Sequence, residues 1–257
     1  MREIVQRLCL SDGEHLAFRH HPGRVPGVVF LPGYRSDMVG AKAQALAAWA
    51  ESSSRALLLF DYRGHGASDG VFTDYVLSDW LDDVLAMLDC GPLAGPVVLV
   101  GSSMGGWLMV LAARRRPERV RGLVGVAAAP DFTTLLEASL SDEERRVLAR
   151  HGQIRRPSRY GEPLPVTAAL LADGHALSVL DGPIPFDGPV HLLHGRADPD
   201  VPWDRSARLA AALTSGAVTL ELVEDGDHRL SRPEDLRRLT AAVERVLGQV
   251  EARKRRG

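Results

Sequence analysis

The sequence Gly-Ser-Ser-Met-Gly at residues 101–105 constrains the fold of this chain more than any other feature. It follows a short apolar run at residues 97–100, typical of a buried strand, and it opens an apolar stretch with helical character. Small residues two positions before and after Ser103 allow a strand and a helix to approach closely across a very sharp turn. We therefore predict a strand, a tight turn centred on Ser103 and a helix in succession.

Short apolar runs alternate with helical patterns along the chain, which is typical of a parallel sheet covered on both faces. Residues 3–10 and 14–19 alternate around a Ser-Asp-Gly turn and predict an antiparallel hairpin at one sheet edge. Apolar residues at helical spacing between residues 77 and 88 predict a buried helix. The other expected strands are residues 28–31, 56–60, 97–100, 123–127, 189–193 and 218–223.

Residues 132–187 interrupt this alternation, because the segment is too long for an ordinary crossover. We expect a small cap insertion in an otherwise single domain spanning residues 1–257. Prolines in residues 160–165 and 180–185 predict irregular, mobile loops there. Five apolar residues are expected either to pack on the main domain or to form a wall of a substrate site: Leu135, Leu136, Leu140, Val147 and Leu148.

Helix beginnings and the chain end are predicted from polar residues. Ser36 or Asp37 is expected to cap the alanine-rich helix that runs toward Trp49. Residues 231–234, Ser-Arg-Pro-Glu, match a capping box at the start of the last helix. The basic residues 253–256 are expected to form a solvated tail beyond that helix.

Two later strands also run into polar turns. Residues 194–202 read His-Gly-Arg-Ala-Asp-Pro-Asp-Val-Pro and follow the strand predicted at 189–193. Residues 224–228 read Glu-Asp-Gly-Asp-His and follow the strand predicted at 218–223. A serine, then an acid, then a histidine thus occur in this order, each after a strand.

The motifs Gly-Ser-Ser-Met-Gly-Gly, His-Gly-x-x-Asp-x-x-Val-Pro and Gly-Asp-His resemble the signature loops of the α/β-hydrolase superfamily. This resemblance implies a mostly parallel, eight-stranded sheet with helices on both faces, and a catalytic triad of Ser103, Asp198 and His228. In such a triad the imidazole takes the proton of the attacking serine, and the carboxylate orients the imidazole and stabilises its cationic form.

Several nearby residues offer alternatives. Asp200, or Asp131 after the preceding strand, is an alternative acid. Ser102 is expected to be only a packing or hydrogen-bonding neighbour of the nucleophile. His65 is expected to shape a turn, and His194, at a strand end, to be a structural histidine bonded to the backbone.

The resemblance also implies an oxyanion hole made of two backbone N–H groups, those of Met104 and Tyr34. Arg35, beside Tyr34, has two interpretations. Its cation pairs with an anionic group of a substrate, or it forms an ion pair with Asp37 or Asp61 that shapes the loop.

Residues 33–43 and 60–70 resemble more narrowly the branch of palmitoyl-protein thioesterases and acyl-glucuronide esterases, with its bacterial relatives. The likeness is closest over residues 27–132. It implies a serine esterase or thioesterase that forms an acyl-enzyme, with small acyl esters, acyl thioesters or acylated proteins as substrates.

Other functions on the same fold are alternatives to a serine esterase or thioesterase. Ser103 at the turn rules out a dehalogenase, which requires aspartate there. A cofactor-free perhydrolase or oxygenase, a peptidase and a noncatalytic binding module remain alternatives, although a binding module is expected to lack a triad member. Neither clustered metal ligands nor a phosphate-binding loop is evident, so we expect no cofactor and no metal.

The composition of the chain limits its possible binding partners and its cellular location. A net charge of −2 and an isoelectric point near 6.5 argue against nucleic-acid binding. Two cysteines, Cys9 and Cys90, fit a reducing compartment. We recognise no secretory signal, and no apolar stretch approaches the ~20 residues of a membrane span. The cytoplasm is therefore the expected location, and the oligomeric state is left open.

Overall fold

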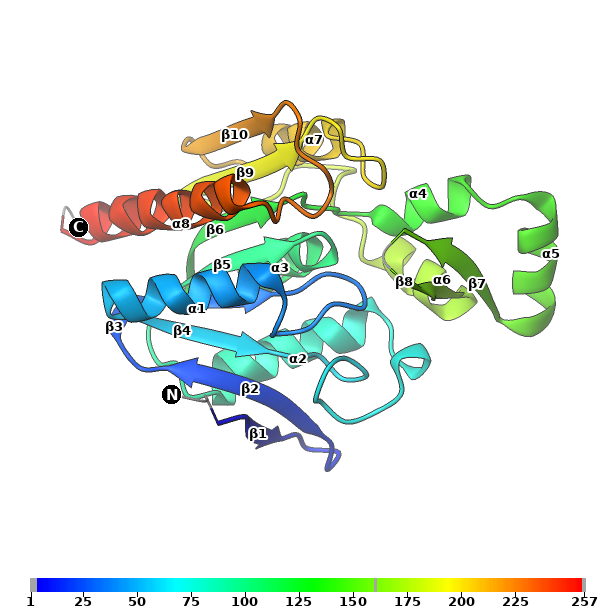
Figure 1. Cartoon of the computed structure of the whole chain (residues 1–257), viewed down its shortest axis with the longest axis horizontal. Coiled ribbons are helices and arrows are strands. Elements are labelled where there is room, and N and C mark those ends of the chain that lie inside the picture. Colours follow the sequence, from blue (N-terminus) through cyan, green and yellow to red (C-terminus); the bar gives the residue numbers. More distant parts are fainter. Residues whose placement is uncertain (1–3, 160, 256–257) are drawn as a thin grey trace.

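The strand built around residues 97–100 lies near the middle of an eight-stranded sheet in the computed structural model, which describes residues 4–159 and 161–255 (Figure 1). The spatial order of its strands is β1-β2-β4-β3-β5-β6-β9-β10. β1 and β2 form an antiparallel hairpin, β2 pairs antiparallel with β4, and all later pairings are parallel. The predicted α/β fold with a mostly parallel, eight-stranded sheet is confirmed.

All the predicted strands are present. Several have longer bounds because ladder pairing continues beyond the apolar runs, whereas the first arm of the hairpin, predicted over residues 3–10, is limited to Gln6–Cys9. Only Glu3 of the predicted hairpin lies outside the described residues. The strands of the main sheet are β1 (Gln6–Cys9), β2 (His15–His21), β3 (Arg24–Leu31), β4 (Arg55–Phe60), β5 (Val97–Ser102), β6 (Val120–Val126), β9 (Val190–Gly195) and β10 (Val218–Val223).

Helices cover both faces of the sheet and close one apolar core on each (Figure 1). α1 (Ala41–Ser53) and α8 (Pro233–Lys254) pack on one face. α2 (Leu77–Cys90), α3 (Met104–Arg115) and α7 (Asp204–Ala212) contribute to the core on the other. The predicted helix at 77–88 is confirmed as α2, and its apolar positions are buried.

Residues 132–187 lie between β6 and β9; their helices and strands project beyond the carboxyl ends of the main sheet, and their last residues return toward its amino ends (Figure 1). They contain α4 (Phe132–Ala138), α5 (Asp142–His151), the antiparallel strands β7 (Gln153–Ser158) and β8 (Gly161–Thr167), and α6 (Ala168–Ala176). Leu140 and Leu148 are buried in a small separate core of this insertion. Leu136 contacts that core and also the main one.

The prediction of an irregular loop at residues 160–165 is wrong for the described residues 161–165, which belong to β8. Two prolines are tolerated because β8 pairs with a single neighbour, so that its other edge needs no ladder donors. Tyr160 lies outside the described residues. Residues 180–185 are irregular apart from an isolated bridge between Ile184 and Leu213.

Both predicted helix caps are wrong. α1 begins at Ala41 after Gly40, because Asp37 instead accepts the nearby amide of Val39 and the loop continues further. α8 begins at Pro233 with Arg232 as its N-cap, since the fixed φ of proline suits the first helical position. There the carboxylate of Asp235, and not that of Glu234, accepts the amide hydrogen of Arg232.

The expected basic tail is also corrected. Arg253 and Lys254 belong to the last turn of α8, where cations interact favourably with the helix dipole. The guanidinium of Arg253 donates to the carbonyl of Asp187. Arg255 follows as the C-cap, and Arg256 lies outside the described residues.

Candidate active site

Ser103 occupies the turn between β5, which ends at Ser102, and α3, which begins at Met104. Its backbone φ of 53° and ψ of −118° lie in a region that side-chain-bearing residues rarely adopt. A Cβ on Gly101 would lie 2.3 Å from the carbonyl oxygen of Gly105. The close approach predicted from the small residues is therefore present. Ser102 is buried at the strand end.

The structure brings Ser103, His228 and Asp198 together from three different strand ends. Nε2 of His228 lies 3.1 Å from Oγ of Ser103, and Nδ1 lies 2.8 Å from Oδ2 of Asp198. The residues follow β5, β9 and β10, whose carboxyl ends lie at the same edge of the sheet. A continuous hydrogen-bonded row thus runs from the serine hydroxyl to a carboxylate.

The Asp198 carboxylate is held by four hydrogen bonds. Oδ1 accepts from the backbone amides of Asp200 and Val201, at 2.8 Å and 2.9 Å. Oδ2 lies close to ring nitrogens of His228 and His194. Burial opposes ionisation, but the hydrogen bonds from His194 and His228 outweigh it and hold the pKa of Asp198 well below its usual range. The carboxylate is consequently ionised at neutral pH.

The two alternative acids, Asp131 and Asp200, make different contacts. Asp131 is buried, and its carboxylate accepts hydrogen bonds from the amides of Val179 and Leu180 and from the hydroxyl of Ser178. It thereby ties the end of the insertion to the end of β6. Asp200 is exposed beside the site and contributes its amide to Asp198.

Met104 follows Ser103 in the chain, and the loop that carries Tyr34 passes beside Ser103. Met104 is the first residue of α3, so its amide belongs to the helix N-terminus, where backbone N–H groups lack intrahelical acceptors. Tyr34 follows Gly33, where an added Cβ would lie 3.2 Å from Cβ of Ser103. The loop after β3 therefore passes directly against the serine.

Buried polar groups hold that loop in place. Oδ1 of Asp61 accepts the amide hydrogen of Met38 at 2.7 Å, and burial raises the pKa of Asp61 to about 6. The hydroxyl of Tyr62 donates to the carbonyl of Pro32 at 3.1 Å. Both ends of the turn that carries Tyr34 are thus anchored to the loop after β4.

Arg35 contacts the insertion. Its Nη1 donates to the carbonyl of Pro163 in β8 at 3.1 Å, and its guanidinium lies 5.7 Å from the ring centroid of Phe72. Within the described part of the chain, no ion pair joins Arg35 to Asp37 or Asp61. The expected intraloop ion pair is therefore wrong, because the side chain extends toward β8.

His65 bonds to the backbone on both sides of its ring. Nε2 accepts the amide hydrogen of Arg35 at 3.3 Å, and Nδ1 faces the carbonyl of Arg63 at 3.2 Å. Burial lowers the pKa of His65 to about 4, so the ring is neutral at pH 7. This arrangement agrees with the structural role predicted for it.

The expected backbone contact of His194 is present, but sequence reasoning missed its contact with Asp198. Its Nε2 lies 3.0 Å from the carbonyl of Val201 and 3.1 Å from Oδ2 of Asp198. The four-residue separation of His194 and Asp198 in one turn was the signal available in the sequence.

One group of possible metal ligands coincides with this site. Asp198, Asp200 and His228 each place a ligand atom within 4.8 Å of the others. The Nδ1 of His228 and both oxygens of Asp198 already take part in hydrogen bonds within the chain. These contacts suit the triad geometry better than an ion, and the expectation of no metal stays a prediction.

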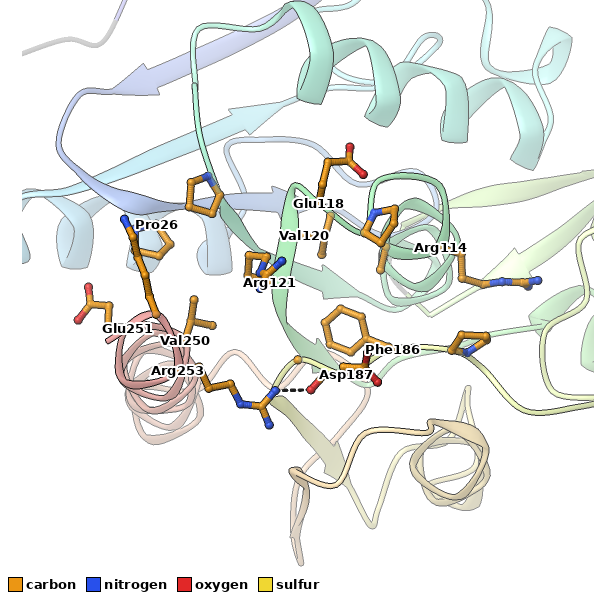
Figure 2. Close-up of a pocket in the computed structure, with 16 residues that line it drawn as sticks. Pro26, Arg114, Glu118, Val120, Arg121, Phe186, Asp187, Val250, Glu251 and Arg253 are labelled. Atoms are coloured by element: carbon orange, nitrogen blue, oxygen red, sulfur yellow. Dashed lines mark hydrogen bonds between the residues drawn. The ribbon is translucent and has the colours of Figure 1, made fainter. Parts of the chain in front are cut away.

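A separate groove of about 840 Å³ lies away from this site (Figure 2). It is formed at the amino ends of β5 and β6, before β9, and beside the end of α8, whereas Ser103 lies at the carboxyl end of β5. Phe186, Arg121 and Arg253 line it, and Arg253 is bonded to Asp187 there (Figure 2). The groove is therefore not part of the candidate active site.

No helix in the described ranges combines the length and apolar character needed to cross a membrane.

Comparison with known proteins places the chain in a family. The sequence profile described as the alpha/beta hydrolase family matches residues 28–239. The mouse mitochondrial palmitoyl-protein thioesterase ABHD10 is 38% identical over 244 residues, which cover 93% of this chain and 81% of the mouse protein. The human protein of the same name is 37% identical over 242 residues, which cover 93% and 78% of the two chains.

Solved structures agree with the sequence comparison. Alpha/beta hydrolase domain-containing protein 10 from mouse matches with a TM-score of 0.89 at 37% identity, covering 96% of this chain and 99% of that one. A putative hydrolase from Agrobacterium vitis S4 matches with a TM-score of 0.91 at 40% identity, covering 96% and 100%. The resemblance found in the sequence motifs is confirmed, and the chain belongs to the alpha/beta hydrolase family of enzymes.

Proposed function

We propose that this enzyme is a serine hydrolase that cleaves carboxylic ester or thioester bonds through an acyl-enzyme intermediate. The observation that carries the proposal is the row of hydrogen-bond contacts from Ser103 through His228 to Asp198. A hydroxyl beside an imidazole that is itself paired with a buried carboxylate is the arrangement that activates serine for acyl transfer.

In the first half-reaction, Oγ of Ser103 attacks the acyl carbon while Nε2 of His228 takes its proton. The carbonyl oxygen gains negative charge in the resulting tetrahedral intermediate. We assign the stabilisation of this charge to the backbone amides of Met104, the residue after the serine, and of Tyr34, in the loop that passes against it. Collapse of the intermediate breaks the bond to the alcohol or thiol, which leaves with the proton from His228.

Water completes the cycle. It attacks the acyl-serine ester as His228 again accepts a proton, and collapse returns that proton to Ser103 and releases the carboxylic acid. Asp198 holds His228 with Nδ1 protonated, so that Nε2 is free to accept, and its charge stabilises the imidazolium in both half-reactions.

The substrate class follows from the relatives and from the surroundings of the serine. The two curated relatives described above are named palmitoyl-protein thioesterases, which supports an acyl thioester as substrate. Tyr34 and Phe132 lie with ring centroids 5.8 Å apart, and Trp107 lies 5.7 Å from Phe132. An aromatic side chain on the loop that passes against Ser103 suits an apolar acyl chain carried by a small molecule or by a protein.

We further propose that residues 132–187 form a cap on the single hydrolase domain of residues 1–257. Its position at the carboxyl ends of the strands and its contacts with Tyr34 and Arg35 support this assignment (Figure 1). A substrate contact by Arg35 remains a prediction, since its guanidinium already donates to Pro163. The cytoplasmic location also stays a prediction, and the two mammalian relatives are named mitochondrial.

The noncatalytic alternative is disfavoured by the same geometry. A module that only binds ligands has no need for the hydroxyl, imidazole and ionised carboxylate to lie within hydrogen-bond distance of one another. A peptidase or a perhydrolase would use the same three residues. These interpretations differ from the proposal in the substrate on which the enzyme acts.

The test is a panel of nitrophenyl esters and acyl thioesters of graded chain length, assayed with the wild type and Ser103→Ala. We expect turnover by the wild type and a loss of at least ~10³-fold in the variant. Ser102→Ala is the matched control, since it removes the neighbouring hydroxyl and should retain activity. Intact-mass analysis after treatment with a fluorophosphonate should show one adduct in the wild type and none in Ser103→Ala. Full turnover by Ser103→Ala would refute the proposal.

A further inference from the structure

His194 is a buried histidine that contacts the carboxylate proposed as the catalytic acid. It lies in β9 and has no exposed side-chain surface, and neither has Asp198. Its Nε2 lies 3.1 Å from Oδ2 of Asp198, and its Nδ1 lies 2.7 Å from Oγ of Ser206 in α7. The triad contacts therefore continue past Asp198 into the protein interior.

The surroundings of the His194 ring fix the direction of its Nε2–H group. Nε2 faces two acceptors, Oδ2 of Asp198 and the carbonyl oxygen of Val201, so this nitrogen must carry a proton. Nδ1 lies against the hydroxyl of Ser206, which is fully buried as well. The ring is thereby held in one orientation with its Nε2–H directed at the carboxylate.

Two imidazole N–H groups consequently donate to the same oxygen of Asp198. His228 approaches Oδ2 at 2.8 Å and His194 approaches it at 3.1 Å, while the amides of Asp200 and Val201 hold Oδ1. A carboxylate bound in this way cannot rotate about its Cβ–Cγ bond without breaking several hydrogen bonds at once.

We propose that His194 is a positioning residue, which orients Asp198 toward His228 and shares the negative charge of Oδ2 with it. The inference rests on the proposed function, because it assigns His194 a part in the same reaction. Removing the His194 donor leaves more of the charge on Oδ2 for His228 and leaves the carboxylate less firmly oriented. The first effect favours protonation of His228, and the second lowers kcat.

The test compares His194→Leu, which removes the donor, with His194→Gln, whose amide nitrogen can occupy the place of Nε2. The matched control is His191→Leu on the same strand, because His191 is also buried but its Nε2 contacts Glu221. The readouts are kcat and KM for a nitrophenyl ester per fluorophosphonate-titrated site, and kcat/KM against pH. The acid limb of that curve reports the ionisation of His228 in the free enzyme. Asp200, whose carboxylate also lies close to His228, is unchanged in every variant.

We expect His194→Leu to lower kcat per titrated site by roughly 10-fold or more with little change in KM. Its acid limb should move to higher pH, and His194→Gln should recover most of both effects. His191→Leu should match the wild type in kcat per titrated site and in the position of the acid limb. The inference would be overturned if His194→Leu only reduced the number of active sites that fluorophosphonate titrates, while the remaining sites kept a normal kcat and an unmoved acid limb. That result would show that His194 only supports folding.

A second comparison covers the case in which His194→Leu does not fold. Ser206→Ala, which removes the hydroxyl beside Nδ1 of His194, is then measured and must shift the acid limb relative to His191→Leu; a wild-type curve for Ser206→Ala would overturn the inference. Ser103→Ala in the same assay separates this result from the proposed function. If it stays active, the serine mechanism fails; if it is inactive while the His194 variants behave as wild type, only the role of His194 fails.

Discussion

The hydroxyl of Tyr34 donates a hydrogen bond of 2.5 Å to the backbone carbonyl of Pro165. Tyr34 follows Gly33 in the loop that passes against Ser103, whereas Pro165 lies in β8 of the insertion, 131 residues later. With the contact from Arg35 to Pro163, this bond attaches one strand of the insertion to the loop that we assign to the oxyanion hole. The position of the insertion and the geometry of that loop are therefore coupled.

Replacement of Tyr34 by phenylalanine tests this coupling. The variant keeps the ring and the backbone amide but leaves the Pro165 carbonyl without its donor, a loss of about 1 kcal/mol. We expect a several-fold decrease in kcat for a nitrophenyl ester, because the amide of residue 34 is held less firmly. Tyr75→Phe is the matched control, since the hydroxyl of Tyr75 bonds to Glu14 instead. Equal kcat values for both variants would argue against coupling through this hydrogen bond.

The identity of the catalytic acid is tested by three isosteric substitutions. Asp198→Asn removes the charge beside His228 and favours the wrong imidazole tautomer, so we expect kcat to fall by ~10⁴-fold. Asp200→Asn should retain activity, because residue 200 supports Asp198 through its backbone amide. Asp131→Asn should lower the unfolding temperature but retain activity, because Asp131 holds the end of the insertion. An inactive Asp200→Asn or Asp131→Asn enzyme that is correctly folded would contradict this assignment.

Burial of His65 predicts how stability depends on pH. Its folded-state pKa of about 4 lies below the ordinary value of 6.5, so between these values the unfolded chain binds more protons. The free energy of unfolding should therefore rise as the pH increases from about 4 to 6.5. Acidification across the same window should lower it by up to ~3 kcal/mol. Urea unfolding at several pH values measures this slope.

His65→Asn should flatten the slope, whatever it does to the absolute stability, because residue 65 then no longer titrates. His151→Gln is the control, since His151 is exposed at the end of α5. A slope unchanged by His65→Asn would show that other groups cause the pH dependence.

The tight packing around the serine turn predicts opposite effects of two glycine-to-alanine changes. A Cβ at Gly105 would lie 2.0 Å from the carbonyl oxygen of Leu31, so α3 would have to move away from β3. We expect Gly105→Ala to lower the free energy of unfolding by ~3 kcal/mol or more and to reduce activity. Gly248→Ala lies in α8 with open space around it and should stabilise by ~0.5–1 kcal/mol. Equal stability of the two variants would contradict the close approach.

Local patterns predicted the strands, the buried helix and the turn at Ser103 because each depends on residues close together in the sequence. Apolar runs identified the strands, although ladder pairing extended β5 and β6 beyond them. The predicted helix caps were wrong because capping depends on where the preceding loop is anchored. Met38 is held by Asp61, 23 residues later, and no local pattern reports that contact.

The sequence by itself determined the family, the mostly parallel eight-stranded sheet expected of it and the residue types at 103, 198 and 228, because short motifs carry that information. Only the tertiary structure decided which groups meet around them. The two histidines on one oxygen of Asp198 come from β9 and the loop after β10, and the partner of Arg35 comes from β8. Side-chain hydrogen bonds require atoms to lie within about 3 Å, and distances of that kind are set by packing between distant segments and not by local propensity.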